Sequence, residues 1–314
     1  MSAAQSVAVL GYGAIGRQVV AQLQARGTKV TLAQRSRPKD LPPDVSFKPT
    51  DLADPKAAAD ACAGVSAVIC AVGLPYTAKA FTEDWPVVMT NGLNGCAASG
   101  ARFVLADNLY MYGPQTTPLR KDMALTAYGG KPKARAVLTR MWQEAHAAGK
   151  VQATAVRAAD FYGADAPTSL ISAFGVVRLL QGKAAMSPFP ADQPHDFTYL
   201  PDFARALITL ADAPDADYGQ AWHVPNAPTR TLREVLALAA GLIGVKPRLS
   251  VMPEPVRRVL GLFNPILAEL GEMRFQWQRP FHVDASKFIG RFGGQITPLE
   301  QGLAETIAAY RATG

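Results

Sequence analysis

Three glycines near the N-terminus, Gly11, Gly13 and Gly16, have the spacing of a phosphate-binding turn between a strand and a helix. Gly11 allows a tight turn, and Gly13 lets the backbone approach a pyrophosphate. Gly16 lets the helix pack closely against the strand. A helix beginning at Ala14 and Ile15 would direct its unpaired N–H groups and its positive dipole end towards the phosphates. The pattern predicts a dinucleotide site, and the alternative is a purely structural glycine-rich turn.

The residues after the second predicted strand, at 29–33, bear on which dinucleotide would bind. A carboxylate at this point bonds the free 2′-hydroxyl of an adenosine ribose, whereas an arginine accommodates a 2′-phosphate. This chain has Arg35 and Arg37 there and no acid. We therefore expect NADP to be preferred, with NAD as the other cofactor. The alternative is that both arginines are solvated loop charges.

Two later segments also follow predicted strands. Asp51 comes after the strand expected at 45–48, and it would lie near the adenine or serve only as a turn residue. Gly73 ends the unbroken apolar run 67–72, which is typical of a parallel strand buried on both faces. Since ligands bind open α/β sheets at the carboxyl ends of the strands, we expect the chain at Gly73 to pass the cofactor.

Strand and helix patterns alternate over the first half of the chain. Strands are expected at residues 6–10, 29–33, 45–48, 67–72, 102–106 and 151–157, and helices at 14–25, 87–99 and 133–148. This order predicts an α/β fold with a Rossmann-type, doubly wound parallel sheet of about seven strands. Residues 1–165 would form the dinucleotide-binding core. Residues 166–314 would form mainly a smaller C-terminal substrate lobe, with some segments returning to the core.

Composition narrows the classes of partner. The net charge is +7 over 314 residues, but the basic residues are scattered, so we expect no nucleic-acid partner. No apolar stretch is long enough to cross a bilayer and no signal peptide is evident, which predicts a cytoplasmic protein without membrane attachment. The three cysteines and four histidines lack ligand spacing, so no metal site is expected.

Taken together, these features resemble the extended short-chain dehydrogenase/reductase superfamily, which contains the NAD-dependent epimerases and dehydratases, and in particular its atypical members. The likeness covers nearly the whole chain. It rests on the glycine turn, Asp51-Leu52, Tyr112-Gly113, the segment 157–163 and the segment 198–202. The resemblance implies the fold and a bound NAD(P), with Asp51 and Leu52 among the cofactor-binding residues.

The chain departs from the superfamily in the residues that perform the chemistry. Relatives carry a Ser or Thr five residues before the glycine of the Tyr-Gly pair, and a Tyr-x-x-x-Lys on the next helix whose tyrosine is the general acid/base. Here Asn108 stands at the Ser/Thr position, and Lys131 and Arg135 stand where Tyr and Lys are expected. Tyr128 lies one turn earlier. We expect Asn108 to hydrogen-bond a substrate oxygen. We expect Tyr128 to exchange the proton with the substrate, while nearby Lys131 lowers the pKa of its phenol.

Alternatives remain for each of these roles. Tyr110 or Tyr162 would be another source of the proton, and each tyrosine has an alternative as a half-buried aromatic. Two functions stay open: an NADP-dependent oxidoreductase or epimerase/dehydratase-like enzyme acting on a small carbonyl or alcohol, and a dinucleotide-binding sensor or regulatory protein without turnover. The missing dyad favours the sensor, whereas the intact cofactor turn and full substrate lobe favour the enzyme. We expect an enzyme with a small-molecule substrate, and the sequence leaves open whether it forms a homodimer.

Overall fold

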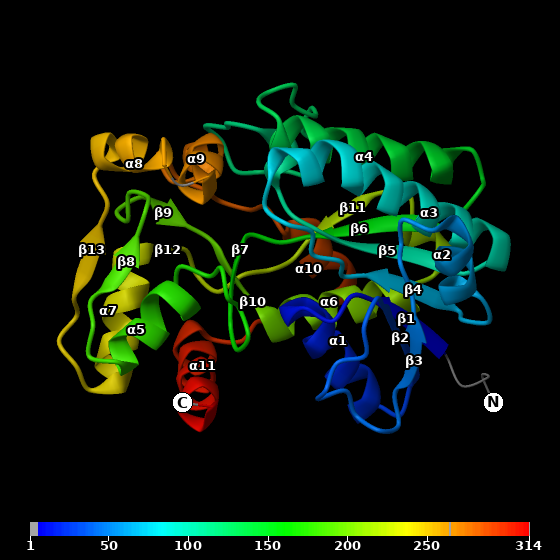
Figure 1. The fold of residues 1–314 in the computed structure, drawn as a ribbon, viewed down its shortest axis with the longest axis horizontal. Helices are drawn as coiled ribbons and strands as arrows, with labels where there is room; N and C mark the ends of the chain where they lie inside the picture. The colour runs from blue at the N-terminus through cyan, green and yellow to red at the C-terminus, as the bar shows by residue number, and fades with distance from the viewer. Residues whose placement is uncertain (1–5, 264, 314) are drawn as a thin grey trace. The chain divides into compact units, whose positions relative to one another are not determined.

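The computed structural model describes residues 6–263 and 265–313, which divide into two compact units (Figure 1). Unit 1 contains the chain up to Met111 and the segments Leu125–Arg157 and Phe203–Trp222. Unit 2 contains Tyr112–Ala124, Ala158–Asp202 and the chain from His223 onward. The chain therefore leaves and re-enters each unit several times.

A seven-stranded sheet forms the centre of unit 1, in the order β11-β6-β5-β4-β1-β2-β3. Its strands are β1 (Ser6–Leu10), β2 (Lys29–Gln34), β3 (Ser46–Pro49), β4 (Ala67–Cys70), β5 (Arg102–Asp107), β6 (Ala153–Arg157) and β11 (Ala221–His223). Strand β1 pairs in parallel with both β2 and β4, and β3, β5 and β6 extend the parallel pairing outward. The predicted α/β class and doubly wound parallel sheet of about seven strands are confirmed.

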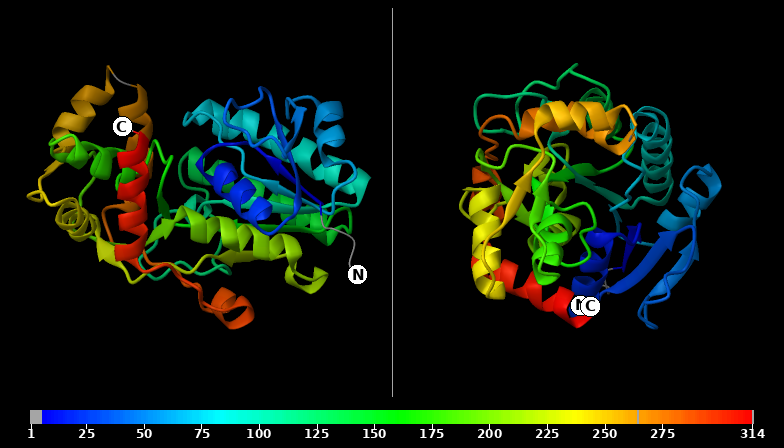
Figure 2. Two further views of the ribbon diagram at one scale, coloured as in Figure 1. Left: turned by 90° about the horizontal axis from the view of Figure 1, so that it is seen from below. Right: turned by 60° about the vertical axis from the view of Figure 1, so that its left-hand side comes forward.

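Helices cover both faces of this sheet. The helices of the sheet unit are α1 (Ala14–Ala25), α2 (Pro55–Cys62), α3 (Trp85–Ser99), α4 (Lys131–Ala147) and α6 (Leu200–Asp212). Figures 1 and 2 show α2, α3 and α4 on one face and α1 and α6 on the other. Apolar side chains such as Leu10, Val68 and Phe103 are completely buried, as expected for parallel strands covered on both sides.

Unit 2 has short paired strands and its own apolar core. The strands are β7 (Asp160–Tyr162), β8 (Ala185–Ser187), β9 (Pro194–His195), β10 (Phe197–Tyr199), β12 (Arg230–Thr231) and β13 (Leu249–Val251). The helices are α5 (Val177–Leu180), α7 (Leu232–Ile243), α8 (Glu254–Gly261), α9 (Pro265–Glu272), α10 (Ser286–Phe292) and α11 (Leu299–Thr313). Strands β7 and β10 pair in parallel, as do β8 and β13, whereas β9 and β12 are antiparallel.

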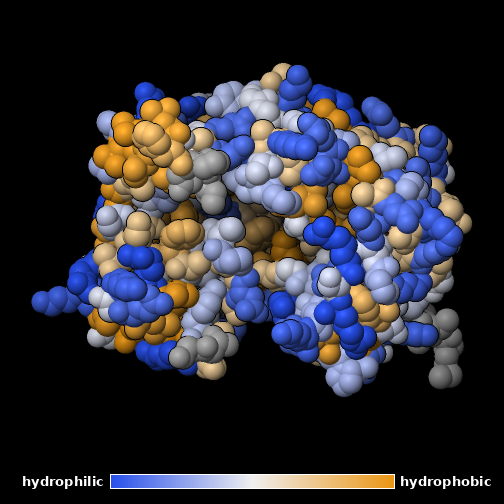
Figure 3. Space-filling view, in the orientation of Figure 1, coloured by the Kyte–Doolittle hydropathy of each residue, from blue (hydrophilic) through white to orange (hydrophobic). Residues whose placement is uncertain are grey.

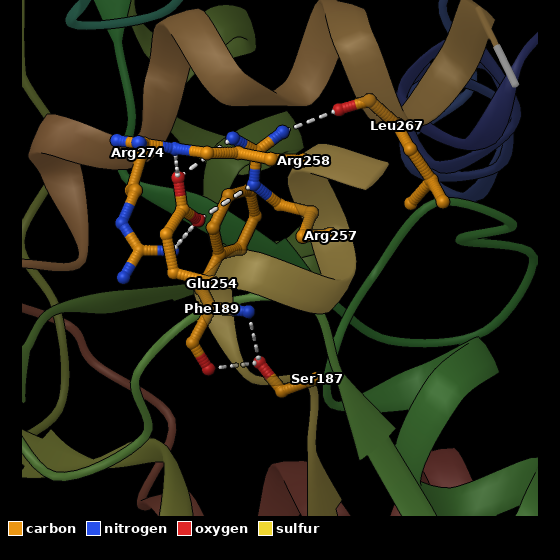
Figure 4. A network of polar contacts seen from close by, with 7 residues as sticks. All are labelled: Ser187, Phe189, Glu254, Arg257, Arg258, Leu267 and Arg274. Carbon is orange, nitrogen blue, oxygen red and sulfur yellow. Dashed lines mark hydrogen bonds and ion pairs between the residues drawn. The ribbon is translucent and has the colours of Figure 1, made fainter. Parts of the chain in front are cut away.

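One carboxylate joins α8 to the segment that follows α9. Glu254 accepts hydrogen bonds from Arg257, Arg258 and Arg274, and Arg257 also donates to the carbonyl of Leu267 at 2.7 Å (Figure 4). The hydrogen bond from Arg257 lowers the pKa of Glu254 to about 2. Glu254 therefore keeps its negative charge throughout the neutral and mildly acidic range.

The outer side of α8 carries exposed apolar side chains, which gather in one patch on the face seen in Figure 3. Val259 is 58% exposed, and Leu262 and Phe263, just after the helix, are 79% and 83% exposed. In the part of the chain that the structure describes, no helix has both the length and the apolar character needed to cross a membrane.

Candidate functional site

The glycine turn between β1 and α1 leaves no room for side chains at its first and last positions. Gly11 has φ +93, and a Cβ placed on it would lie 3.0 Å from the carbonyl oxygen of Ala71. A Cβ on Gly16 would lie 2.1 Å from the carbonyl oxygen of Gly11. The contact at Gly16 is too short for any side chain, and at Gly11 the positive φ and the tight contact both disfavour one, so the turn requires glycine at these two positions.

The middle glycine lies in a different environment. A Cβ on Gly13 would meet no heavy atom of the protein within 4 Å, so the space in front of this backbone is open. Gly13 caps α1 without a side-chain hydrogen bond, and the first turn of the helix carries no acid. The N–H groups of Ala14, Ile15 and Gly16 have no intrahelical acceptor at a helix N-terminus. Open space in front of these donors is what an anionic pyrophosphate requires.

The last residue of β2 supports the turn. Gln34 Oε1 accepts a hydrogen bond from the backbone N–H of Tyr12 at 3.0 Å, and its Nε2 donates to the carbonyl of Ser36 at 2.7 Å. Gln34 therefore joins the glycine turn to the loop after β2. Sequence reasoning noted the absence of an acid here but missed this role of the amide. A polar residue ending the strand next to the glycine turn was the available signal.

Both arginines of the loop after β2 are exposed. The guanidinium carbon of Arg37 lies 5.7 Å from the centre of the Phe47 ring, within the range of a cation–π contact. A third arginine that the sequence did not indicate, Arg17, stacks on the Tyr12 ring at 4.5 Å and forms an ion pair with Asp40. The loop therefore presents Arg35 and Arg37 to solvent, while Arg17 holds it to α1.

The segment after β3 is an ordered turn. Asp51 Oδ1 accepts from the backbone N–H of Ala53 at 3.0 Å, which supports its reading as a turn residue. Leu52 is buried, and its carbonyl accepts from Nδ2 of Asn91 at 2.8 Å. Asn91 is a buried side chain on α3 that sequence reasoning missed. Three residues beyond the end of β4, Gly73 is exposed, and a Cβ there would meet nothing within 4 Å.

The residues suggested for chemistry lie in different local environments. Asn108 Oδ1 accepts from the backbone N–H of Tyr110 at 3.0 Å, which fixes the side-chain amide just beyond β5. Tyr128 lies in the turn before α4 and is 44% exposed. Lys131 is completely buried, and its Nζ lies 5.0 Å from the centre of the Tyr76 ring. The structure thus brings Lys131 to Tyr76, a residue that sequence reasoning did not single out.

A buried charge network lies at the carboxyl ends of β5 and β6. Asp107 Oδ2 is 3.2 Å from Nε of Arg157, and its Oδ1 is 3.4 Å from a terminal nitrogen of Arg135. Arg157 also donates to Oγ1 of Thr139 at 3.0 Å. The guanidinium of Arg135 stacks on the Trp85 ring at 4.2 Å, and burial lowers its pKa. One buried carboxylate therefore pairs with both guanidinium groups.

In unit 2, Tyr162 is unsuited to proton exchange. Its side chain is 1% exposed, and burial raises its pKa well above the usual value. His195 is also buried, with Nε2 2.7 Å from Oδ2 of Asp160 and its ring stacked on that of Trp277 at 4.0 Å. These contacts place His195 in the core of unit 2.

Cysteines and potential metal ligands do not form a site in the described ranges. The three cysteines are free and buried. Among residues 6–263 and 265–313, no three His, Cys, Asp or Glu side chains lie close enough together to hold a metal ion.

A family model described as the NAD dependent epimerase/dehydratase family matches residues 7–224. No curated protein matches the chain in sequence. Many solved structures match in fold, among them a Thermus thermophilus UDP-glucose 4-epimerase in complex with NAD, at 18% identity and TM-score 0.77, covering 99% of this chain and 100% of that one.

Two other solved structures are similar to the same extent. A UDP-N-acetylglucosamine 4-epimerase from Bacillus cereus is 15% identical with TM-score 0.77, covering 98% of this chain and 96% of that one. A dTDP-glucose 4,6-dehydratase from Streptomyces venezuelae, with NAD bound, is 19% identical with TM-score 0.77, covering 97% and 96%. At these identities, the likeness establishes the fold.

Proposed function

The chain belongs to the NAD dependent epimerase/dehydratase family of extended short-chain dehydrogenases/reductases, and from this premise we propose that it is an NADP-dependent oxidoreductase acting on a small carbonyl or alcohol. The observation that carries the choice of cofactor is the end of β2. Gln34 is engaged with the glycine turn, no carboxylate stands there for a ribose 2′-hydroxyl, and Arg35 and Arg37 are exposed beside it. We also propose that the enzyme works in the cytoplasm.

The residues present fit a dinucleotide. The backbone of Gly11, Gly13, Ala14, Ile15 and Gly16 would hold the pyrophosphate, since the space before Gly13 is open and no acid occupies the first turn of α1.

The remaining cofactor contacts follow along the sheet edge. Arg35 and Arg37 would bind the 2′-phosphate through charge-assisted hydrogen bonds. Asp51 and Leu52 would lie by the adenine, and Gly73 would lie by the nicotinamide. When bound, the nicotinamide supplies or accepts the hydride.

The chain's own residues would orient the substrate and move the proton. Asn108 would donate from Nδ2 to the substrate oxygen, because its Oδ1 is already held by the N–H of Tyr110. A phenol near a cation would exchange the proton, since a nearby positive charge favours the phenolate. We propose that Lys131 is the cation that favours the phenolate. Tyr128, three residues earlier, is the phenol that the sequence favours.

A nucleotide-sugar epimerase or dehydratase is the second candidate, because the structural neighbours are described as acting on UDP- or dTDP-sugars. Such enzymes need the same dinucleotide turn, so the glycine geometry supports both candidates. A dinucleotide sensor without turnover is the third, and it would need the turn but neither Asn108 nor a proton-exchanging phenol.

The proposed function is tested by incubating the protein with NADPH and a panel of aldehydes, ketones and nucleotide sugars, following NADPH absorbance and sugar products. We expect at least one small carbonyl compound to oxidise NADPH. On that substrate, Asn108→Ala should lower kcat by about 10²-fold, the order seen when one oxyanion donor is removed. Asn94→Ala, an exposed asparagine on α3, is the matched control. Epimerised sugars alone would favour the second candidate, and tight NADPH binding without turnover would favour the sensor.

A further inference from the structure

Tyr76 emerges at the centre of the cofactor edge of the sheet. It lies three residues beyond Gly73, on the segment that leaves the carboxyl end of β4. In the sheet, β4 lies between β1, which leads into the glycine turn, and β5, which leads to Asn108. The carboxyl ends of parallel strands lie at one edge of the sheet. The segment with Tyr76 therefore starts between the glycine turn, which would hold the cofactor, and Asn108, which would hold the substrate.

Two cations from α4 lie close to this tyrosine. Lys131 Nζ is 5.0 Å from the centre of the Tyr76 ring. Arg135, four residues later on the same face of α4, interacts electrostatically with the Tyr76 phenol. The Phe81 ring packs against both Tyr76 and Arg135. Its centre lies 5.6 Å from that of the Tyr76 ring, in an edge-on arrangement, and 5.4 Å from the guanidinium carbon of Arg135. Tyr76 is half-buried, so solvent screens these positive charges less than it would at an exposed site.

The other phenols are less suited to proton exchange. Tyr128 is 44% exposed, so solvent screens it from charges. Tyr162 is buried, with a raised pKa. Tyr110 is also half-buried near Arg135, and its ring stacks on Phe81 at 6.5 Å. Tyr76 and Tyr110 both interact electrostatically with Arg135, and Tyr76 in addition has Lys131 over its ring.

We propose that Tyr76, supported by Lys131, is the proton-exchanging phenol of this site, and that it takes the part played in relatives by the tyrosine of Tyr-x-x-x-Lys. This inference rests on the proposed function and refines it. During reduction, a bound NADPH would supply the hydride that forms the new C–H bond at the carbonyl carbon, and the O–H bond of Tyr76 breaks as its proton passes to the carbonyl oxygen of the substrate. The resulting phenolate is stabilised by Lys131 and takes a proton back from water.

The first test needs no substrate. The ultraviolet phenolate band of the protein is titrated against pH for the native chain, Tyr76→Phe, Lys131→Met and Tyr310→Phe, the last altering a half-buried tyrosine of α11. We expect one phenol to ionise at lower pH than the others, and this step to vanish in Tyr76→Phe. It should move to higher pH in Lys131→Met and stay in Tyr310→Phe. A low-pH step that persists in Tyr76→Phe would overturn the proposal.

The second test uses any substrate that oxidises NADPH. Tyr76→Phe should lower kcat by about 10²–10⁴-fold with little change in KM, the range typical of general acid/base catalysis. Lys131→Met should shift the pH profile of kcat, and Lys131→Arg should restore part of the activity. If Tyr128→Phe or Tyr110→Phe loses kcat while Tyr76→Phe keeps it, the inference is wrong and the proposed function stands. If nothing oxidises NADPH, the proposed function fails, and the phenolate titration still decides whether Tyr76 ionises at lower pH than the other phenols.

Discussion

Replacing Asp107 by asparagine is expected to lower the free energy of unfolding by about 3–5 kcal/mol, because it leaves buried guanidinium groups without their carboxylate. The side chain of Asp107 is 2% exposed, and those of its partners Arg135 and Arg157 are 8% and 1% exposed. Urea unfolding measures the change. Asp60→Asn is the matched control, since that carboxylate forms an exposed pair with Lys56 on α2 and such pairs contribute little.

A double variant separates a lost charge partner from a general packing defect. Removing Arg157 as well, in Asp107→Asn/Arg157→Met, should recover part of the lost stability, because fewer buried charges remain unpaired. A cost for Asp107→Asn no larger than that for Asp60→Asn would contradict the assignment. So would a double variant whose cost equals the sum of its two single changes.

The second large effect is expected at the glycine turn, where two alanine substitutions should have different consequences. In Gly13→Ala, the new Cβ would meet no protein atom within 4 Å, and the φ of −74 at this residue is one that alanine adopts readily. The melting temperature should therefore stay near that of the native chain. The new methyl group would nevertheless occupy the approach to the pyrophosphate. The Kd for NADPH should therefore rise by about 10- to 100-fold, equivalent to roughly 1.4–2.8 kcal/mol.

Gly16→Ala should affect both properties. Its Cβ would lie 2.1 Å from the carbonyl oxygen of Gly11, so the start of α1 must move. Thermal unfolding and titration of the two variants side by side make the comparison. Native NADPH affinity in Gly13→Ala would show that the cofactor does not approach this backbone, whereas a native melting temperature in Gly16→Ala would show that the turn is less tight than described.

Local patterns were enough to predict most of the sheet unit. The helix expected at residues 14–25 has the same bounds in the structure, because the glycines before it and the apolar spacing within it act over a few residues. Strand β11 was not predicted, since Ala221–His223 is too short to carry a period. Its position depends on contacts from distant residues, such as the hydrogen bond from Thr154 Oγ1 to the carbonyl of Gln220 at 2.8 Å.

In the candidate site, too, residues that act locally could be predicted from the sequence, whereas contacts between distant segments could not. The glycines and arginines could be identified from spacing, because each acts through its own backbone or charge. Tyr128 was suggested for proton exchange because it is close to Lys131 in sequence. The contact of Lys131 with Tyr76 joins α4 to the loop after β4, and no periodic pattern carries information about such a long-range pair. The same holds for Gln34 and Tyr12, which lie on either side of α1 in the chain.

The central claim, an NADP-dependent site, is tested most directly by calorimetric titration of NADPH and NADH into the native protein and into Arg35→Ala/Arg37→Ala. Charge-assisted hydrogen bonds contribute on the order of 1.5–3 kcal/mol each, so the native chain should bind NADPH at least about tenfold more tightly than NADH. The double variant should lose most of that preference, and Arg140→Ala, which removes an exposed charge from α4, should retain it. Equal affinities in the native protein, or an unchanged ratio in the double variant, would contradict the account.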